Sequence, residues 1–208
     1  MSRPKRLANH SYVGRFQYFL TFCSWKRRRL FEDARAVAET QAHVQRTATE
    51  ESFAVLAYCF MPDHLHLLVR GLDEKSDLRR FVKRSKQAAG YAYKKRRRER
   101  LWQDGYFDRV LRDESEARSC AQYIVNNPVR DGLVARARDY AYLGSSGWSL
   151  DELTKDALDN EAFPTRQAPG LEGPAYTTLP CDLARSRLAH SVGRAFRPGV
   201  RVSRRLRR

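Results

Sequence analysis

The chain has 208 residues, which is enough for one compact domain with appended segments. Its 40 Lys and Arg residues outnumber 24 Asp and Glu residues, and the formal net charge of +16 favours a polyanionic partner such as DNA, RNA or an anionic membrane surface. No apolar run is long enough to span a bilayer, and the start of the chain lacks the apolar core of a signal peptide, so we expect a cytoplasmic protein. The four cysteines include no Cys-x-x-Cys pair, which argues against a structural zinc site, and nothing indicates a secreted disulfide framework.

The sequence of the first part of the chain predicts three strands and one helix. Aromatic and β-branched runs indicate strands, and a segment rich in Ala, Glu, Gln and Arg indicates a helix. The two later strands are separated by a short Met-Pro-Asp turn, so we expect them to pair as a hairpin. In chain order, the predicted elements are a loose basic arm, a strand, a helix and the two hairpin strands, at residues 1–14, 16–23, 33–49, 53–60 and 64–69.

The next part predicts a helix, a strand and a second helix. The first helix covers about 77–99, with Ser76 as its N-cap and with basic residues around its apolar face. Residues 101–111 form a strand, or a loop followed by a strand. The second helix begins after Asp113 or Ser115 and runs to about Asn126, because Pro128 disfavours the α conformation in the residue before it.

This order of elements, β-α-β-β-α-β-α, predicts an α+β fold. The expected architecture is an RRM- or ferredoxin-like antiparallel sheet with helices packed on one face. We expect the domain to cover residues 1–148. We expect residues 149–208 to form a C-terminal extension that is partly helical and then basic and disordered; it ends in an arginine-rich run over 194–208.

Two histidines lie two residues apart at the start of the predicted third strand. Side chains alternate between the faces of a strand, so His64 and His66 project together while Leu65 points to the opposite face. On a central strand the pair would face the last helix. Two adjacent imidazoles form half of a divalent metal site, although a buried histidine is also often a satisfied polar group of the core.

Tyr123 and Asn127 lie four residues apart and therefore share one face of the second helix. An amide oxygen is a suitable ligand for a hard metal ion, and a deprotonated tyrosine can attack phosphorus. Together with the histidine pair they make a plausible phosphotransfer site. The alternative roles are packing of Tyr123 on the sheet and a helix-stop function for Asn127 before proline.

These segments resemble a known family. Met61-Pro62-Asp63-His64-Leu65-His66-Leu67-Leu68-Val69 and the stretch from Tyr123 to Val134, Tyr-Ile-Val-Asn-Asn-Pro-Val-Arg-Asp-Gly-Leu-Val, resemble the REP-associated tyrosine transposases, a branch of the single-tyrosine HUH endonucleases. The segments 101–108 and 140–146 fit the same pattern. The resemblance covers roughly residues 10–148.

The resemblance implies a metal-dependent enzyme that cleaves and rejoins single-stranded DNA near hairpins. His64 and His66 would bind Mg²⁺ or Mn²⁺, and Asn127 lies where relatives place a further polar ligand. Tyr123 would be the nucleophile and would form a 5′-phosphotyrosine. Relatives include monomers and homodimers, and the sequence does not decide between them. No membrane partner is expected.

Basic residues of the first long helix are candidates for contacts with nucleic acid, and Trp102 is a candidate for stacking on unpaired bases. A solvated helix face and a core position for Trp102 are the alternatives. The candidate nucleic-acid-binding residues are Lys83, Arg84, Lys86, Lys94, Lys95 and Trp102.

Two other functions remain open at this stage. A non-catalytic module on the same fold could bind hairpin DNA or RNA. The second alternative function is that of a replication-initiator nickase of the HUH type, but no second tyrosine near Tyr123 and no helicase domain are evident.

Overall fold

The computed structural model describes residues 11–159. The start of the predicted basic arm and most of the predicted C-terminal extension, including the arginine-rich run, lie outside the described residues. The helices and strands are β1 (Gln17–Cys23), α1 (Ala34–Glu50), β2 (Phe53–Met61), β3 (His64–Gly71), α2 (Leu78–Arg97), β4 (Phe107–Leu111), α3 (Glu114–Arg130), β5 (Leu143–Ser145) and α4 (Leu150–Asp159).

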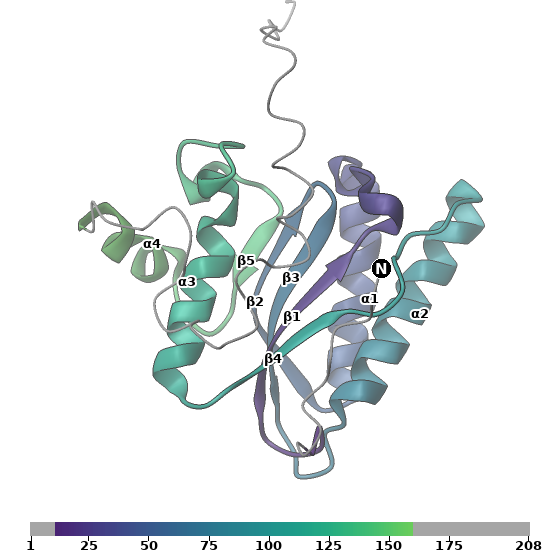
Figure 1. The fold of residues 1–208 in the computed structure, drawn as a ribbon, viewed down its shortest axis with the longest axis horizontal. Helices are drawn as coiled ribbons and strands as arrows, with labels where there is room; N and C mark the ends of the chain where they lie inside the picture. Colours follow the sequence, from purple (N-terminus) through teal and green to yellow (C-terminus); the bar gives the residue numbers. More distant parts are fainter. Residues whose placement is uncertain (1–10, 160–208) are drawn as a thin grey trace, which may run out of the picture. The chain divides into compact units, whose positions relative to one another are not determined.

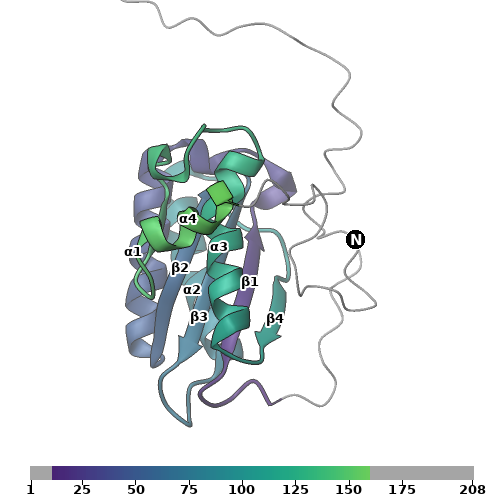
Figure 2. The same cartoon turned by 90° about the vertical axis from the view of Figure 1, so that its left-hand side faces the viewer.

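The strands form one antiparallel sheet in the order β4-β1-β3-β2-β5, with β3 at its centre. Helices α1 and α2 lie together on one face, and α3 with α4 lies on the other (Figure 1, Figure 2). The predicted fold class is confirmed: β1 to β4 with α1 and α2 form the ferredoxin-like unit, and α3 faces the sheet from the opposite side. The short strand β5 was not predicted.

Alternation along β3 sorts its side chains between two cores. Leu65 and Leu67 belong to the core under α1 and α2, whereas Leu68 belongs to the core under α3. His64 and His66 therefore share the α3 face, as the strand periodicity predicts. The hairpin prediction is also confirmed, since β2 and β3 pair directly across a tight turn.

Helix α2 begins one residue later than predicted, and its N-cap is also one residue later. Asp77 is the N-cap, and its carboxylate accepts hydrogen bonds from the backbone N–H groups of Arg79 at 2.8 Å and Arg80 at 3.2 Å. Ser76 was the wrong residue because its hydroxyl is used elsewhere: it donates to the backbone oxygen of Ser52 at 2.7 Å. A carboxylate also suits the positive end of the helix dipole.

The end of the predicted loose arm is ordered. Tyr12 is only 3% exposed, Val13 forms a β-bridge with Asp77, and the Gly14 N–H donates to the backbone oxygen of Ser76 at 3.0 Å. These contacts attach residues 11–14 to the start of α2, so the expectation of a loose segment was wrong here.

Pro128 does not end α3, which continues to Arg130. The helix closes with a Schellman motif, in which the Gly132 N–H donates to Val129 O at 2.9 Å and the Leu133 N–H donates to Pro128 O at 2.8 Å. Gly132 adopts the required left-handed conformation with φ of 69°. The predicted helix end was wrong because these closing bonds satisfy the backbone oxygens of Pro128 and Val129 in the last turn of the helix.

The part after α3 packs back on the sheet and on α3. Strand β5 pairs with β2, and α4 packs on α3 with Leu153 fully buried. Of the two possibilities for residues 101–111, a loop followed by a strand is confirmed, since β4 begins at Phe107. None of the helices within residues 11–159 combines the length and apolarity needed to cross a bilayer.

Candidate active site

The two histidines of β3 meet through the same ring atom. His64 Nε2 and His66 Nε2 lie 3.0 Å apart, and the ring planes are inclined by 82°. His64 is 5% exposed and His66 is 1% exposed. The predicted juxtaposition of these two residues is therefore present in the structure.

The opposite nitrogen of each ring is held by another side chain. His64 Nδ1 lies 2.7 Å from Asp63 Oδ1, and His66 Nδ1 lies 2.9 Å from Thr21 Oγ1. Arg27 in turn forms an ion pair with Asp63 at 2.7 Å. Such partners orient imidazoles with Nε2 directed at a ligand position, as is typical of metal-binding histidines.

Burial keeps His66 neutral. It lowers the pKa of His66 well below its usual range, and the nearby His64, Arg130 and Arg27 lower it further. A neutral imidazole is the form that binds a metal ion. The positive charges that act on His66 come from two arginines on different segments of the chain.

The donor set fits a divalent ion in part. Two ligands at right angles, each about 2.1 Å from a Mg²⁺ ion, lie about 3.0 Å apart, which is also the separation of the two Nε2 atoms. No group of three or more His, Cys, Asp or Glu side chains suited to a metal ion is found within the part of the chain that the structure describes. Further ligands would have to come from an amide, water or substrate oxygen.

Helix α3 brings Tyr123 to the histidine pair. Its ring packs edge-on against Phe19, with centroids 5.8 Å apart, and against His66, with centroids 5.9 Å apart. Phe19 lies on β1, next to the central strand. Tyr123 thus belongs to the same cluster as the imidazoles, and it is only partly buried.

Asn127 is linked to this cluster through Arg130. The Asn127 amide nitrogen donates to the backbone oxygen of Tyr123 at 2.8 Å, and its Oδ1 accepts a hydrogen bond from Arg130 at 3.1 Å. The Arg130 guanidinium also donates to Tyr123 Oη at 3.3 Å and lies over the Tyr123 ring, 4.4 Å from its centroid. The predicted neighbours Tyr123 and Asn127 share one helical face, with Arg130 as a third member.

Sequence reasoning missed Thr21, Arg27, Asp63 and Arg130 as parts of the site. Thr21 lies directly opposite His66 in the β1–β3 register, which no local pattern reveals. Arg130 is seven residues after Tyr123, a spacing that keeps it on the same helical face. The incorrect helix end at Pro128 concealed that signal, and Asp63 was interpreted as a turn residue only.

Three of the residues predicted to contact nucleic acid make contacts within the protein. Arg84 forms ion pairs with Glu50, the last residue of α1, and with Glu51, which follows it. The Lys86 ammonium donates to the backbone oxygens of Gln103, at 2.9 Å, and Gly105, and burial lowers its pKa to about 8.

The third is Trp102, which is 5% exposed and packs against Phe22 and Phe31 in the core. Because so little of the ring is exposed, its proposed stacking on bases is not supported. The core position, which was the alternative, is the one observed.

The remaining lysines lie on the exposed side of α2. Lys83 and Lys94 line an open groove of about 970 Å³ between α2 and residues 100–106. Tyr91, 72% exposed, lies on the same groove. Lys95 is exposed but does not line it. Neither Lys83, Lys94 nor Lys95 has a carboxylate partner among the described side chains, so these ammonium groups remain available for phosphate.

The chain is similar to known transposases. A protein of Haemophilus influenzae described as a REP-associated tyrosine transposase is 26% identical over 118 residues, which are 51% of this chain and 66% of that relative. The chain thus matches slightly less than two thirds of the relative's length.

A solved structure has a similar fold. The structure of a REP-associated tyrosine transposase bound to a REP hairpin matches with a TM-score of 0.58 and 19% identity, covering 69% of this chain and 82% of that one. At this identity the likeness concerns the fold alone. The family model described as "Transposase IS200 like" matches residues 12–127, which include both histidines and Tyr123. The chain therefore belongs to the IS200-like transposase family.

Proposed function

We propose that this protein is a metal-dependent transposase and endonuclease that cleaves and rejoins single-stranded DNA beside hairpins. The observation that carries the proposal is the packing of Tyr123 on His66, with ring centroids 5.9 Å apart, next to the convergent Nε2 atoms of the histidine pair. A tyrosine beside two metal-binding imidazoles is suited to attack on a phosphodiester.

In the proposed reaction, Tyr123 Oη attacks the phosphorus atom and the bond from phosphorus to the 3′ oxygen breaks. The phenol releases its proton to solvent and the departing 3′ oxygen takes one up, which leaves a 3′-hydroxyl and a 5′-phosphotyrosine. Attack by a 3′-hydroxyl on the phosphotyrosine reverses these steps and rejoins DNA. No external energy source is needed, because one phosphodiester replaces another.

His64 and His66 would hold Mg²⁺ or Mn²⁺, with Asn127 Oδ1 as the proposed protein oxygen ligand. The bound ion would act as a Lewis acid on a phosphate oxygen. Thr21 and Asp63 keep both imidazoles turned toward the ion position. Arg27 keeps the Asp63 carboxylate in place.

We further propose that the groove on α2 contacts hairpin DNA. Lys83 and Lys94 supply positive charge along it, and Tyr91 presents an exposed aromatic ring to which an unpaired base can stack. The solved REP-associated transposase of the same fold is bound to a REP hairpin, which supports this choice of partner.

The test is formation of a covalent adduct. The full-length protein is mixed with Mn²⁺ and single-stranded oligonucleotides from the hairpins that flank its gene, labelled at either the 3′ or the 5′ end. We expect a protein band that keeps the 3′ label after boiling in SDS, because the 5′ phosphate stays on the protein. EDTA should abolish the band.

Tyr123→Phe should reduce adduct formation by at least about a thousandfold, because it removes the nucleophile. Tyr142→Phe is the matched control and should retain the adduct. An adduct that persists in Tyr123→Phe would exclude Tyr123 as nucleophile. Binding of the same DNA without any adduct in the unmodified protein would instead favour the non-catalytic hairpin-binding module.

A further inference from the structure

We infer that Arg130 binds the DNA phosphate that Tyr123 attacks. This inference rests on the proposed function and adds to it a substrate-binding role for Arg130, a residue to which the family resemblance assigned no role. Four features of Arg130 support it: its contacts, its unused donors, its charge environment and its position at the end of α3.

The guanidinium is placed on the reactive tyrosine. Its Nη2 donates to Tyr123 Oη at 3.3 Å and to Asn127 Oδ1 at 3.1 Å, and its carbon atom Cζ lies 4.4 Å from the Tyr123 ring centroid. Its charge also acts on the buried His66. A phosphate that approaches Tyr123 Oη would therefore come within reach of the guanidinium.

Most of its hydrogen-bonding capacity is unused. Among the side chains and backbone groups that the structure describes, Nε and Nη1 of Arg130 make no hydrogen bond, whereas Nη2 makes both of the bonds given above. The planar guanidinium fork matches the oxygen spacing of a phosphate. Arg130 can thus bind phosphate oxygens without releasing Tyr123 or Asn127.

Its charge is also not neutralised. Arg80 and Arg84 pair with Glu51, and Arg136 pairs with Asp139, but Arg130 has no carboxylate at ion-pair distance among the described side chains. An exposed guanidinium beside the neutral His66 imidazole and a phenol attracts an anion. The phosphodiester is the anion that the proposed reaction brings to this place.

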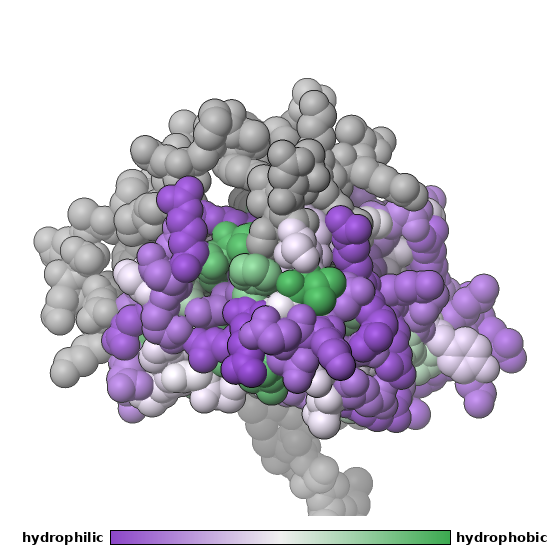
Figure 3. Space-filling model, turned by 90° about the horizontal axis from the view of Figure 1, so that it is seen from below, coloured by the Kyte–Doolittle hydropathy of each residue, from purple (hydrophilic) through white to green (hydrophobic). Residues whose placement is uncertain are grey.

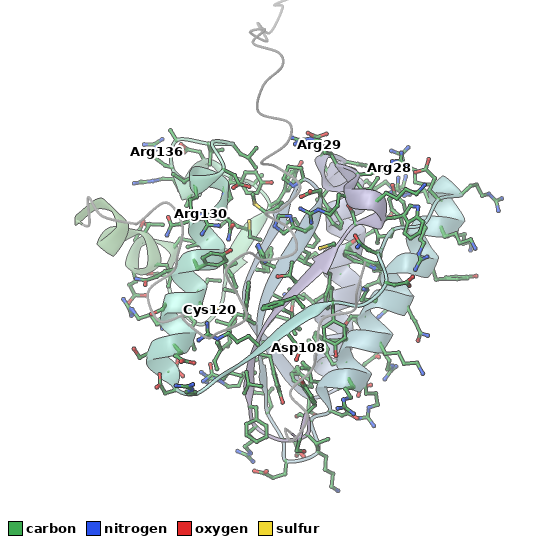
Figure 4. All side chains as sticks on the ribbon, in the orientation of Figure 1. Arg28, Arg29, Asp108, Cys120, Arg130 and Arg136 are labelled. Atoms are coloured by element: carbon green, nitrogen blue, oxygen red, sulfur yellow. The ribbon has the colours of Figure 1, made fainter. Side chains whose placement is uncertain are left out.

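The fold holds Arg130 in this position. Arg130 is the last residue of α3 and lies within the segment that the Schellman motif closes. Figure 4 shows Arg130 between the end of α3 and the sheet, whereas Arg136 projects from the following loop away from the sheet. Arg136 therefore provides a matched control with the same charge on a neighbouring segment.

The test measures binding in the Tyr123→Phe background with EDTA, so that no cleavage occurs. Fluorescence anisotropy at low salt compares hairpin-flanking oligonucleotides that each carry one neutral methylphosphonate, placed in turn at every linkage around the foot of the hairpin. We expect one linkage at which the replacement weakens binding about tenfold, since it removes a charge-assisted contact. Adding Arg130→Gln should abolish the sensitivity to that linkage.

Arg130→Lys should retain part of this sensitivity, and Arg136→Gln should retain all of it. The sensitive linkage should be the one that the unmodified protein cuts. If every linkage shows the same penalty with and without Arg130→Gln, the inference is wrong even when the unmodified protein forms its adduct. If Arg130→Gln abolishes the sensitivity to one linkage but the unmodified protein forms no adduct, Arg130 binds phosphate and the proposed function is wrong.

Discussion

The imidazoles at the start of β3 owe their orientation to residues from other parts of the chain. Thr21 on β1 holds His66, and Asp63 in the hairpin turn holds His64. Strand alternation alone places both rings on one face, but it leaves the ring rotation and the choice of tautomer open. The hydrogen bonds at Nδ1 direct both Nε2 atoms to one position.

Thr21→Val tests this arrangement, since valine has nearly the same shape but cannot bond to His66 Nδ1. We expect the affinity for Mn²⁺ to fall by about tenfold to a hundredfold, measured by isothermal titration calorimetry. Thr47→Val, at an equally buried threonine in α1, should leave the affinity unchanged. Unchanged metal binding in a folded Thr21→Val protein would show that the threonine does not orient His66.

At the scale of elements, the end of α3 determines how much of the site one helix supplies. Arg130 shares a face with Tyr123 and Asn127 only because the helix continues past Pro128 for about half a turn. The Schellman motif at Gly132 stabilises that continuation. The position of Arg130 beside Tyr123 therefore depends on a glycine outside the helix.

Gly132→Ala should destabilise the protein by about 1 kcal/mol, because its φ of 69° is unfavourable for residues with a Cβ atom. No atom lies within 4 Å of the added methyl group, so the backbone conformation alone causes the loss. Urea unfolding followed by tryptophan fluorescence measures it.

Gly147→Ala is the control for this change. Its new Cβ would meet Leu56 at 3.5 Å, an ordinary contact, and its φ is not in the left-handed region. We expect little change in its stability. Equal losses in the two variants would contradict the role given to the Schellman motif.

At the scale of the whole molecule, the basic residues of α2 divide into two groups. Arg80, Arg84, Arg96 and Arg97 of α2 form ion pairs with carboxylates on α1, just before it or just after it, and so join the two helices. Lysines on the groove side of α2 have no such partners among the described side chains. Hydrophilic residues also dominate the face shown in Figure 3, where apolar side chains are confined to a small area.

The groove lysines should therefore determine the salt dependence of DNA binding. Each phosphate contact to single-stranded DNA contributes about 0.7 to the slope of log affinity against log salt. The double change Lys83→Gln and Lys94→Gln should reduce the slope by about 1.4, measured by anisotropy over a salt series. Lys75→Gln, which removes an exposed lysine from the loop before α2, should have a smaller effect. A slope unchanged by the double change would remove the groove from the DNA interface.

The sequence by itself determined the features that depend on local backbone geometry. Strand periodicity placed His64 and His66 on one face, helix periodicity joined Tyr123 to Asn127, and the order of elements predicted the ferredoxin-like sheet. Only the tertiary structure decided which residues from distant parts of the chain contact these elements and side chains. The strand register placed Thr21 opposite His66, the closing bonds of α3 brought Arg130 to Tyr123, and the packing of α1 on α2 neutralised Arg84. Such pairings depend on contacts between residues far apart in the chain, and no local periodicity encodes them.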